Sequence, residues 1–108
     1  MTELNEKQSA RIAGYLGIAQ KAGLISAGDN MVKEALIKEK AEMLVIACDV
    51  APSVKEELTS LAQSQAVPVI QWPNKLDLGL IVGKSRRGAL AVLDKGFAEA
   101  ISKVVESL

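Results

Sequence analysis

The chain has 108 residues, 49% of them hydrophobic, which suits one domain with a modest core. Its 13 basic and 13 acidic residues cancel, which excludes the overall positive field of strongly basic nucleic-acid-binding proteins, so any anion binding must be local. The sequence lacks histidine, the commonest general base and metal ligand, and its single cysteine, Cys48, excludes an internal disulfide.

The amino-terminal part predicts a helix, a short strand and a second helix. In residues 5–22 apolar side chains recur at helical spacing, and Gly23 then supplies a stop signal. Residues 24–27 are a short apolar piece typical of a strand. The triplet Gly28-Asp29-Asn30 has the composition of a helix start, with Asp29 or Asn30 as its cap.

The central part predicts a buried strand, a helix, another strand and a short helix. Residues 43–48 are apolar without interruption, which is typical of a central strand covered on both faces, and Cys48 is expected to act as a small hydrophobic residue there. A proline is tolerated in the first turn of the helix that opens at residues 51–53. Residues 68–70 follow as a strand, and residues 74–81 as a short helix.

The carboxyl-terminal part predicts a strand over residues 89–93 and a last helix capped by Asp94. The apolar side of that helix is made by Phe97, Ile101, Val104 and Leu108. Helices that alternate with short apolar strands favour an α/β fold, a three-layer α/β/α sandwich with a small mixed four-stranded sheet. We expect a single domain that spans residues 1–108.

The first 16 residues are acidic and polar, unlike a signal peptide, and no stretch approaches the length of a membrane span. We therefore expect a soluble cytoplasmic protein without a membrane partner, bound cofactor or metal. A monomer is the favoured oligomeric state.

Gly79 and the run Gly83-Lys84-Ser85 resemble a phosphate-binding loop at first sight. Such a loop needs four residues between its first glycine and the Gly-Lys pair, and it leads from a strand into a helix. Here three residues intervene, and the segment follows a predicted helix and enters a predicted strand. The sequence therefore disfavours an ATP or GTP site.

The segment 84–88 has two interpretations. Lys84, Arg86 and Arg87 lie within four residues without an acidic neighbour, and Gly88 lets the backbone approach a ligand closely. The segment is either a solvated turn or a loop whose arginines clamp RNA phosphates.

The start of the second predicted helix also has two interpretations. Its free amides and the positive end of the helix dipole attract anions, and Asn30 can read base edges with its amide. The alternative is a simple helix cap. Asp49 lacks a catalytic partner in the sequence, and Trp72 is expected to be a half-buried cover for the sheet edge rather than a platform for bases.

Three blocks of sequence in a fixed order carry a family resemblance. They are "YLGIAQKAGLISAGDNMVKEAL", "KAEMLVIACDVAPSVKEEL" and "VPVIQWPNKLDLGLIVGKSRRGALAVLDKGFAEAI". Over nearly its whole length the chain resembles the kink-turn-binding ribosomal proteins of the L7Ae type, and within them the YlxQ-like bacterial branch. The resemblance implies the sandwich fold and RNA binding. The second helix would start at the tandem G·A pairs of a kink-turn, and the loop before the last strand would cover an extruded nucleotide.

The resemblance points to ten RNA-binding residues: Gly28, Asp29, Asn30, Met31, Lys33, Lys84, Ser85, Arg86, Arg87 and Gly88. Against the family pattern G-x-N-E-x-x-K, Met31 stands in place of the glutamate and Glu34 in place of the lysine. Lys33 lies one residue early, about 100° around the helix. We therefore expect Arg86 and Arg87 to contribute more to binding than is usual.

The leading functional hypothesis is a non-enzymatic protein that binds structured RNA, either ribosomal RNA or another RNA with a sharp bend. The alternative is a protein-interaction module on the same fold with weak or lost kink-turn binding. A nucleotide-using enzyme is the third possibility.

Overall fold

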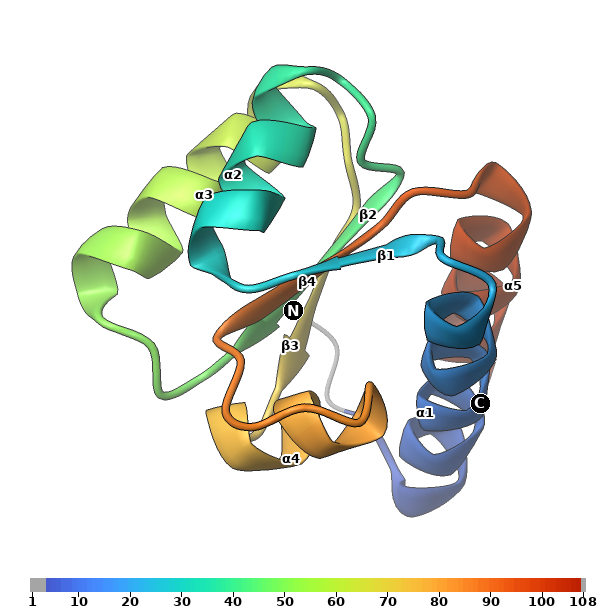
Figure 1. The fold of residues 1–108 in the computed structure, drawn as a ribbon. Coiled ribbons are helices and arrows are strands. Elements are labelled where there is room, and N and C mark those ends of the chain that lie inside the picture. The colour runs from blue at the N-terminus through green and yellow to red at the C-terminus, as the bar shows by residue number, and fades with distance from the viewer. Residues whose placement is uncertain (1–3, 108) are drawn as a thin grey trace.

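The computed structural model describes residues 4–107 and alternates helices with strands along the chain (Figure 1). The elements are α1 (Glu6–Lys21), β1 (Ile25–Ala27), α2 (Asp29–Ile37), β2 (Met43–Ala47), α3 (Pro52–Ser64), β3 (Val69–Trp72), α4 (Lys75–Ile81), β4 (Ala89–Val92) and α5 (Lys95–Glu106). Each helix and strand that the sequence predicts is present, with ends that differ by a few residues at most.

The four strands form one mixed sheet in the order β1-β4-β2-β3. β4 runs antiparallel to both β1 and β2, whereas β2 and β3 are parallel. Helices α2 and α3 pack together on one face, and α1, α4 and α5 lie on the other (Figure 1). The predicted α/β fold with three layers and a mixed four-stranded sheet is confirmed.

The core lies where the two central strands are covered by helices on both faces. Every residue of β2 and β4 is buried, which explains their uninterrupted apolar sequences. Trp72, at the end of edge strand β3, is also buried, with 6% of its surface exposed, so it covers the sheet edge more completely than predicted.

The prediction that Cys48 is a buried hydrophobic residue is wrong. The strand ends at Ala47, and Cys48 is exposed where the chain leaves the sheet. Its backbone N–H still donates to the Trp72 carbonyl at 2.8 Å. An apolar run in the sequence does not reveal which of its last residues passes beyond the covering helices.

Most helix ends follow the predicted signals. The Asp94 carboxylate accepts from the Phe97 amide at 2.9 Å and caps α5 as predicted. Asn74 caps α4 in the same way, through the Asp77 amide at 2.8 Å. Gly23, with φ of 75°, ends α1 in the left-handed conformation that glycine favours.

The cap predicted for α2 is wrong. Gly28 occupies the N-cap position, and no side chain in the described part of the sequence caps this helix. Because the Gly28 amide donates to the Ala89 carbonyl at 2.9 Å, the turn into α2 is fixed by the sheet. Asp29 and Asn30 therefore already belong to the first helical turn.

The topology gathers four connections at one end of the sheet. Strands β1, β2 and β3 end there and β4 begins there, as the pairs Ala27↔Leu90, Ile46↔Ala89 and Ala47↔Trp72 show. The start of α2, the start of α4 and the segment 84–88 therefore lie close together. This is where both candidate binding segments of the sequence fall.

The prediction of one domain over residues 1–108 includes positions outside the described range and stays a prediction. Leu108, expected on the apolar side of the last helix, is one of them; Ile101 and Val104 are buried on that side and Phe97 is partly buried. Among residues 4–107, no helix combines the length and the apolar character that crossing a membrane requires.

Candidate functional site

The first turn of α2 presents free backbone amides to solvent. Gly28 has φ of 101° and ψ of 153°, a conformation that favours glycine, and it turns the chain sharply from β1 into the helix. The first intrahelical bond is made by the Val32 amide to the Gly28 carbonyl at 2.9 Å. The backbone amides of residues 29–31 come before that bond in the chain and so have no carbonyl partner within the helix. The side chains of these three residues are exposed. A helix end of this kind attracts anions.

The glycine-lysine-serine run forms the end of α4. The Lys84 amide donates to the Gly79 carbonyl at 2.9 Å, and the Gly83 amide donates to the Leu80 carbonyl at 3.0 Å. Gly83 has φ of 69°, so these bonds make a Schellman cap. Two amides that a phosphate-binding loop would need are used by the helix, which agrees with the sequence argument against such a loop.

Gly79 has a packing role. A Cβ atom at this position would lie 1.8 Å from the Ser85 carbonyl oxygen, so the loop backbone rests directly on α4. The loop is held further by the Arg87 amide, which donates to the Lys75 carbonyl at 3.1 Å, and by the Gly88 carbonyl, which accepts from the Ala47 amide at 2.8 Å. The segment 84–88 is therefore anchored at both ends.

The loop and the start of α2 are in direct contact. A Cβ on Gly28 would lie 3.7 Å from Arg87 Cδ, so the stem of Arg87 crosses the tip of the helix. A Cβ on Gly88 would lie 2.7 Å from Asp29 Oδ1, and Gly88 is buried, so the space beside this glycine is filled by the protein and is not open to a ligand as predicted. The two segments, about 55 residues apart in the sequence, therefore form one continuous surface.

The cations of the loop are available to a ligand. Arg87 Nη1 donates to Ser85 Oγ at 3.0 Å and to the Arg86 carbonyl at 2.9 Å, which orients its guanidinium without neutralising it. Within residues 4–107, the ion pairs involve Lys33, Lys38 and Lys95, so Lys84, Arg86 and Arg87 are outside them.

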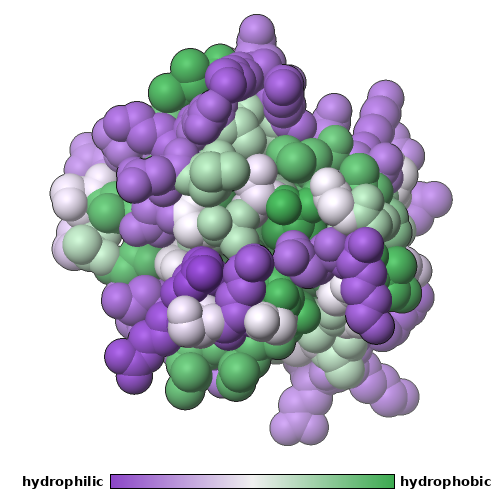
Figure 2. Space-filling model, in the orientation of Figure 1, coloured by the Kyte–Doolittle hydropathy of each residue, from purple (hydrophilic) through white to green (hydrophobic). Residues whose placement is uncertain are grey.

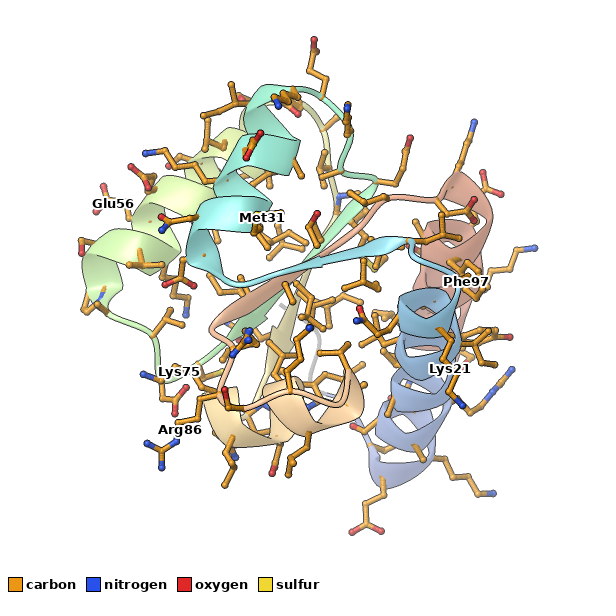
Figure 3. The ribbon with its side chains drawn as sticks, viewed as in Figure 1. Lys21, Met31, Glu56, Lys75, Arg86 and Phe97 are labelled. Carbon is orange, nitrogen blue, oxygen red and sulfur yellow. The ribbon has the colours of Figure 1, made fainter. Side chains whose placement is uncertain are left out.

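Arg86 also lines a polar hollow beside α4. Figure 3 shows Arg86 and Lys75 side by side near the start of this helix. The other lining residues are Asp49, Asn74, Leu76 and Asp77. Asp49 has a structural task here, because its Oδ1 accepts from the Lys75 amide at 2.9 Å. Lys75 is absent from the sequence-based set, although its place directly after the end of β3 is a signal that points to this edge of the sheet.

Lys33 and Glu34 are already engaged on α2. Lys33 Nζ lies 3.2 Å from Glu57 Oε2 of α3, which holds the ammonium toward the neighbouring helix. Lys38 donates a hydrogen bond to Glu34, and this bond together with the positive charge holds the pKa of Glu34 below its ordinary value. Unlike Lys84, Arg86 and Arg87, Lys33 therefore already has an acidic partner.

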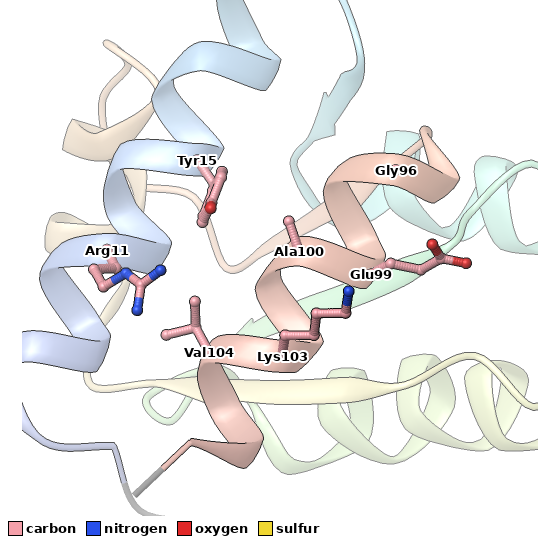
Figure 4. Close-up of a pocket in the computed structure, with 7 residues that line it drawn as sticks. All are labelled: Arg11, Tyr15, Gly96, Glu99, Ala100, Lys103 and Val104. Carbon is pink, nitrogen blue, oxygen red and sulfur yellow. The ribbon is translucent and has the colours of Figure 1, made fainter.

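A separate hollow lies between α1 and α5 (Figure 4). Arg11 and Lys103 lie on its two sides, with Tyr15 and Glu99 also in its lining. Among its described lining residues it offers one carboxylate, and no nucleophile is paired there with a base. No group of three or more metal-ligating side chains is present among the described residues. The concentration of cations and free amides at the α2 end of the sheet remains the best-developed site.

Comparisons with known proteins place the chain among proteins of this fold. The family model described as "Ribosomal protein L7Ae/L30e/S12e/Gadd45 family" matches residues 10–102. The RNA-binding protein YlxQ of Enterococcus faecium is 22% identical over 103 residues, which covers 95% of this chain and 99% of that protein. The large ribosomal subunit protein eL8 of Thermoplasma volcanium is 30% identical over 106 residues, which covers 97% of this chain and 88% of that protein. The structure of the Giardia lamblia 15.5kD RNA binding protein has the same fold, with a TM-score of 0.82 at 20% identity over 95% of this chain and 88% of that one.

Proposed function

Because this chain belongs to the ribosomal protein L7Ae/L30e/S12e/Gadd45 family, as its sequence suggested, we propose that it binds structured RNA without catalysing a reaction. The contact surface consists of the start of α2 and the loop 84–88. The observation that carries this proposal is the packing of the Arg87 stem against Gly28, which joins both segments into one surface. The names of its relatives, an RNA-binding protein and a ribosomal protein, support it.

The start of α2 contributes donors and a base-reading amide. The free amides of residues 29–31 and the helix dipole favour phosphate or base acceptors. The exposed Asn30 side chain can donate to and accept from a base edge at the same time. Gly28 has no side chain, so the stem of Arg87 can pack against the turn and place its guanidinium beside the start of α2.

The loop contributes charge and a place for an unstacked nucleotide. Arg86 and Arg87 match phosphate oxygens with their planar guanidinium groups, and Lys84 and Ser85 add donors next to them. The hollow lined by Arg86 and Lys75 can receive one nucleotide turned out of a bent RNA. A helix tip beside such a hollow fits a kink-turn, in which tandem G·A pairs adjoin an extruded nucleotide.

We assign most of the electrostatic affinity to the loop. Lys33 is paired with Glu57, Glu34 is paired with Lys38, and Asp29 is acidic, so the side chains of α2 add no net positive charge. Met31, which is 55% exposed, offers an apolar surface where the family pattern has a carboxylate. Recognition by α2 then depends on its backbone and on Asn30.

A binding series tests the proposal. Affinity is measured by gel shift for a kink-turn RNA and for the same RNA with its G·A pairs replaced, and the intact kink-turn is expected to bind more tightly. Replacing Arg86→Ala together with Arg87→Ala should weaken binding and lower the salt slope by about 1.4 to 1.8, because each of the two phosphate contacts contributes about 0.7 to 0.9. The matched control is Lys40→Ala with Lys95→Ala, at the opposite end of the sheet, which should leave the slope unchanged.

Equal and negligible affinity for both RNAs would contradict the proposal. A protein partner that survives nuclease treatment of a pull-down would then favour the protein-interaction alternative. An unchanged salt slope in the Arg86 and Arg87 variant would show that phosphate contacts lie elsewhere.

A further inference from the structure

A groove runs between α1 and α4, on the helical layer that also carries the loop 84–88. Its volume is about 430 Å³, and Gly83 at the end of α4 lines one part of it. Two glycines of α1 create the space. A Cβ added to Gly14 would have no atom within 4 Å, and one added to Gly17 would lie 3.7 Å from the Ile81 carbonyl oxygen.

The walls of the groove carry large aliphatic side chains that the fold leaves exposed. Ile18 of α1 is 58% exposed and Leu80 of α4 is 62% exposed, and both line the groove. Leu76, one turn before Leu80, is 48% exposed and borders the hollow beside Arg86. Figure 2 shows hydrophobic residues gathered at the lower edge of the molecule, over α4. Clustered exposure of this kind is typical of an interaction surface, whereas single exposed residues are not.

The surroundings of the groove are positive although the chain has no net charge. Lys21 lines the groove, and Lys84 follows Gly83 directly. Residues 6–21 and 75–88 together hold seven basic and two acidic residues, whereas residues 29–64 hold four basic and seven acidic residues. The α1 and α4 side therefore attracts a negatively charged partner.

The lining of the groove distinguishes between a protein and the other possible occupants. RNA is disfavoured because the described lining residues include one cation and no aromatic side chain on which a base could stack. A second copy would have to offer its acidic α2 and α3 face to the positive groove. Such a contact joins two different surfaces and leads to open chains of molecules rather than a closed dimer.

We propose that the groove between α1 and α4 binds a short acidic amphipathic helix of a partner protein. Two aliphatic side chains of that helix lie between Ile18 and Leu80, and its carboxylates face Lys21, which lines the groove. This is helix-in-groove recognition, in which an apolar stripe gives affinity and flanking charges give orientation. Because the RNA-binding residues lie outside the groove, partner and RNA can be bound at the same time.

A selection experiment tests this inference without knowledge of the natural partner. A display library of 16-residue helical peptides, with all positions varied, is selected for binding to the full-length protein. Enriched peptides should carry Leu or Ile at helical spacing and a net negative charge. In ¹⁵N-labelled protein, the best peptide should shift the amide signals of Gly14, Gly17 and Gly83.

Matched variants separate groove binding from other contacts. Replacing Ile18→Gln together with Leu80→Gln should weaken peptide binding at least about tenfold, since two buried aliphatic contacts are lost. Ile37→Gln, at a side chain that is 57% exposed on α2, should leave it unchanged. Because Ile18, Leu80 and Ile37 are exposed, the folded state is retained. With Arg86→Ala and Arg87→Ala in place, the peptide should still bind and still shift the signals of the same three glycines, so this result is independent of RNA binding.

The inference is overturned if no peptide is enriched, or if enriched peptides are basic. It is also overturned if the glycine signals stay in place, or if the Ile18 and Leu80 variant binds as tightly as the Ile37 variant. Competition between RNA and the selected peptide would show that the groove is part of the RNA surface instead.

Discussion

At the scale of single residues, two glycines decide whether the loop 84–88 can reach the start of α2. Gly79 lets the loop rest on α4, and Gly88 leaves room for the Asp29 carboxylate. Lys84, Ser85, Arg86 and Arg87 could be proposed as a site from the sequence because cations without acidic neighbours are visible there. The role of Gly79 could not, since only the folded chain brings Ser85 onto it.

Replacing Gly79→Ala should destabilise the protein by about 1–3 kcal/mol, because its Cβ would overlap the Ser85 carbonyl and the loop must move. Gly14→Ala is the matched control, also in a helix but with open space around the new methyl group. It should stabilise the protein by about 0.5–1 kcal/mol. Urea denaturation measures both. Equal effects of the two substitutions would contradict the close packing of the loop on α4.

Replacing Glu57→Gln should strengthen RNA binding. The substitution releases Lys33 from its partner on α3, and the freed ammonium lies on the helix that we propose faces RNA. One additional phosphate contact should raise the affinity about two- to tenfold and steepen the salt dependence by about 0.7 to 0.9. Stability should change by less than about 1 kcal/mol, since the pair is exposed. Glu56→Gln, on the same helix, is the control, because it removes one negative charge without breaking the Lys33 pair. An identical gain in affinity there would show that the change in net charge, and not the release of Lys33, strengthens RNA binding.

At the scale of elements, the sequence was sufficient to predict every helix and strand because each has a clear signal. Uninterrupted apolar runs marked β2 and β4, and Asp94 marked the start of α5. Two features were not predictable. The cap of α2 depends on the bond from the Gly28 amide to Ala89, and the exposure of Cys48 depends on where β2 ends. Both follow from long-range pairing, which local sequence does not contain.

Two helices end in the left-handed conformation without glycine. Ala66 after α3 has φ of 56° and Glu39 after α2 has φ of 57°. The amides that follow complete the same type of cap, Val67 to the Ala62 carbonyl at 2.8 Å and Lys40 to the Ala35 carbonyl at 2.9 Å. A side chain in this conformation costs about 1–2 kcal/mol.

Replacing Ala66→Gly or Glu39→Gly should therefore stabilise the protein. We expect the free energy of unfolding to rise by about 0.5–1 kcal/mol for each. Glycine removes the steric cost of the left-handed conformation, and this gain exceeds the entropy that glycine adds to the unfolded chain. Thermal unfolding followed by circular dichroism measures the change. Ala10→Gly, at an exposed position inside α1, is the control and should lose a similar amount. A loss at positions 66 and 39 would contradict the cap geometry.

At the scale of the whole molecule, a net charge of zero conceals a separation of charge. The α1, α4 and loop side is basic, and the α2 and α3 side is acidic. Total composition therefore excludes a uniformly basic protein but not a local anion site. The free amides at the start of α2 lie directly beside the basic loop, so two groups that attract anions are adjacent in the fold.

The most direct test of the joined surface is a titration of ¹⁵N-labelled protein with kink-turn RNA, followed by the backbone amide signals. We predict that signals of residues 28–31 and of residues 84–88 shift together, over the same range of RNA concentration. Shifts in only one of these segments, or shifts confined to other parts of the molecule, would contradict a shared RNA-binding surface.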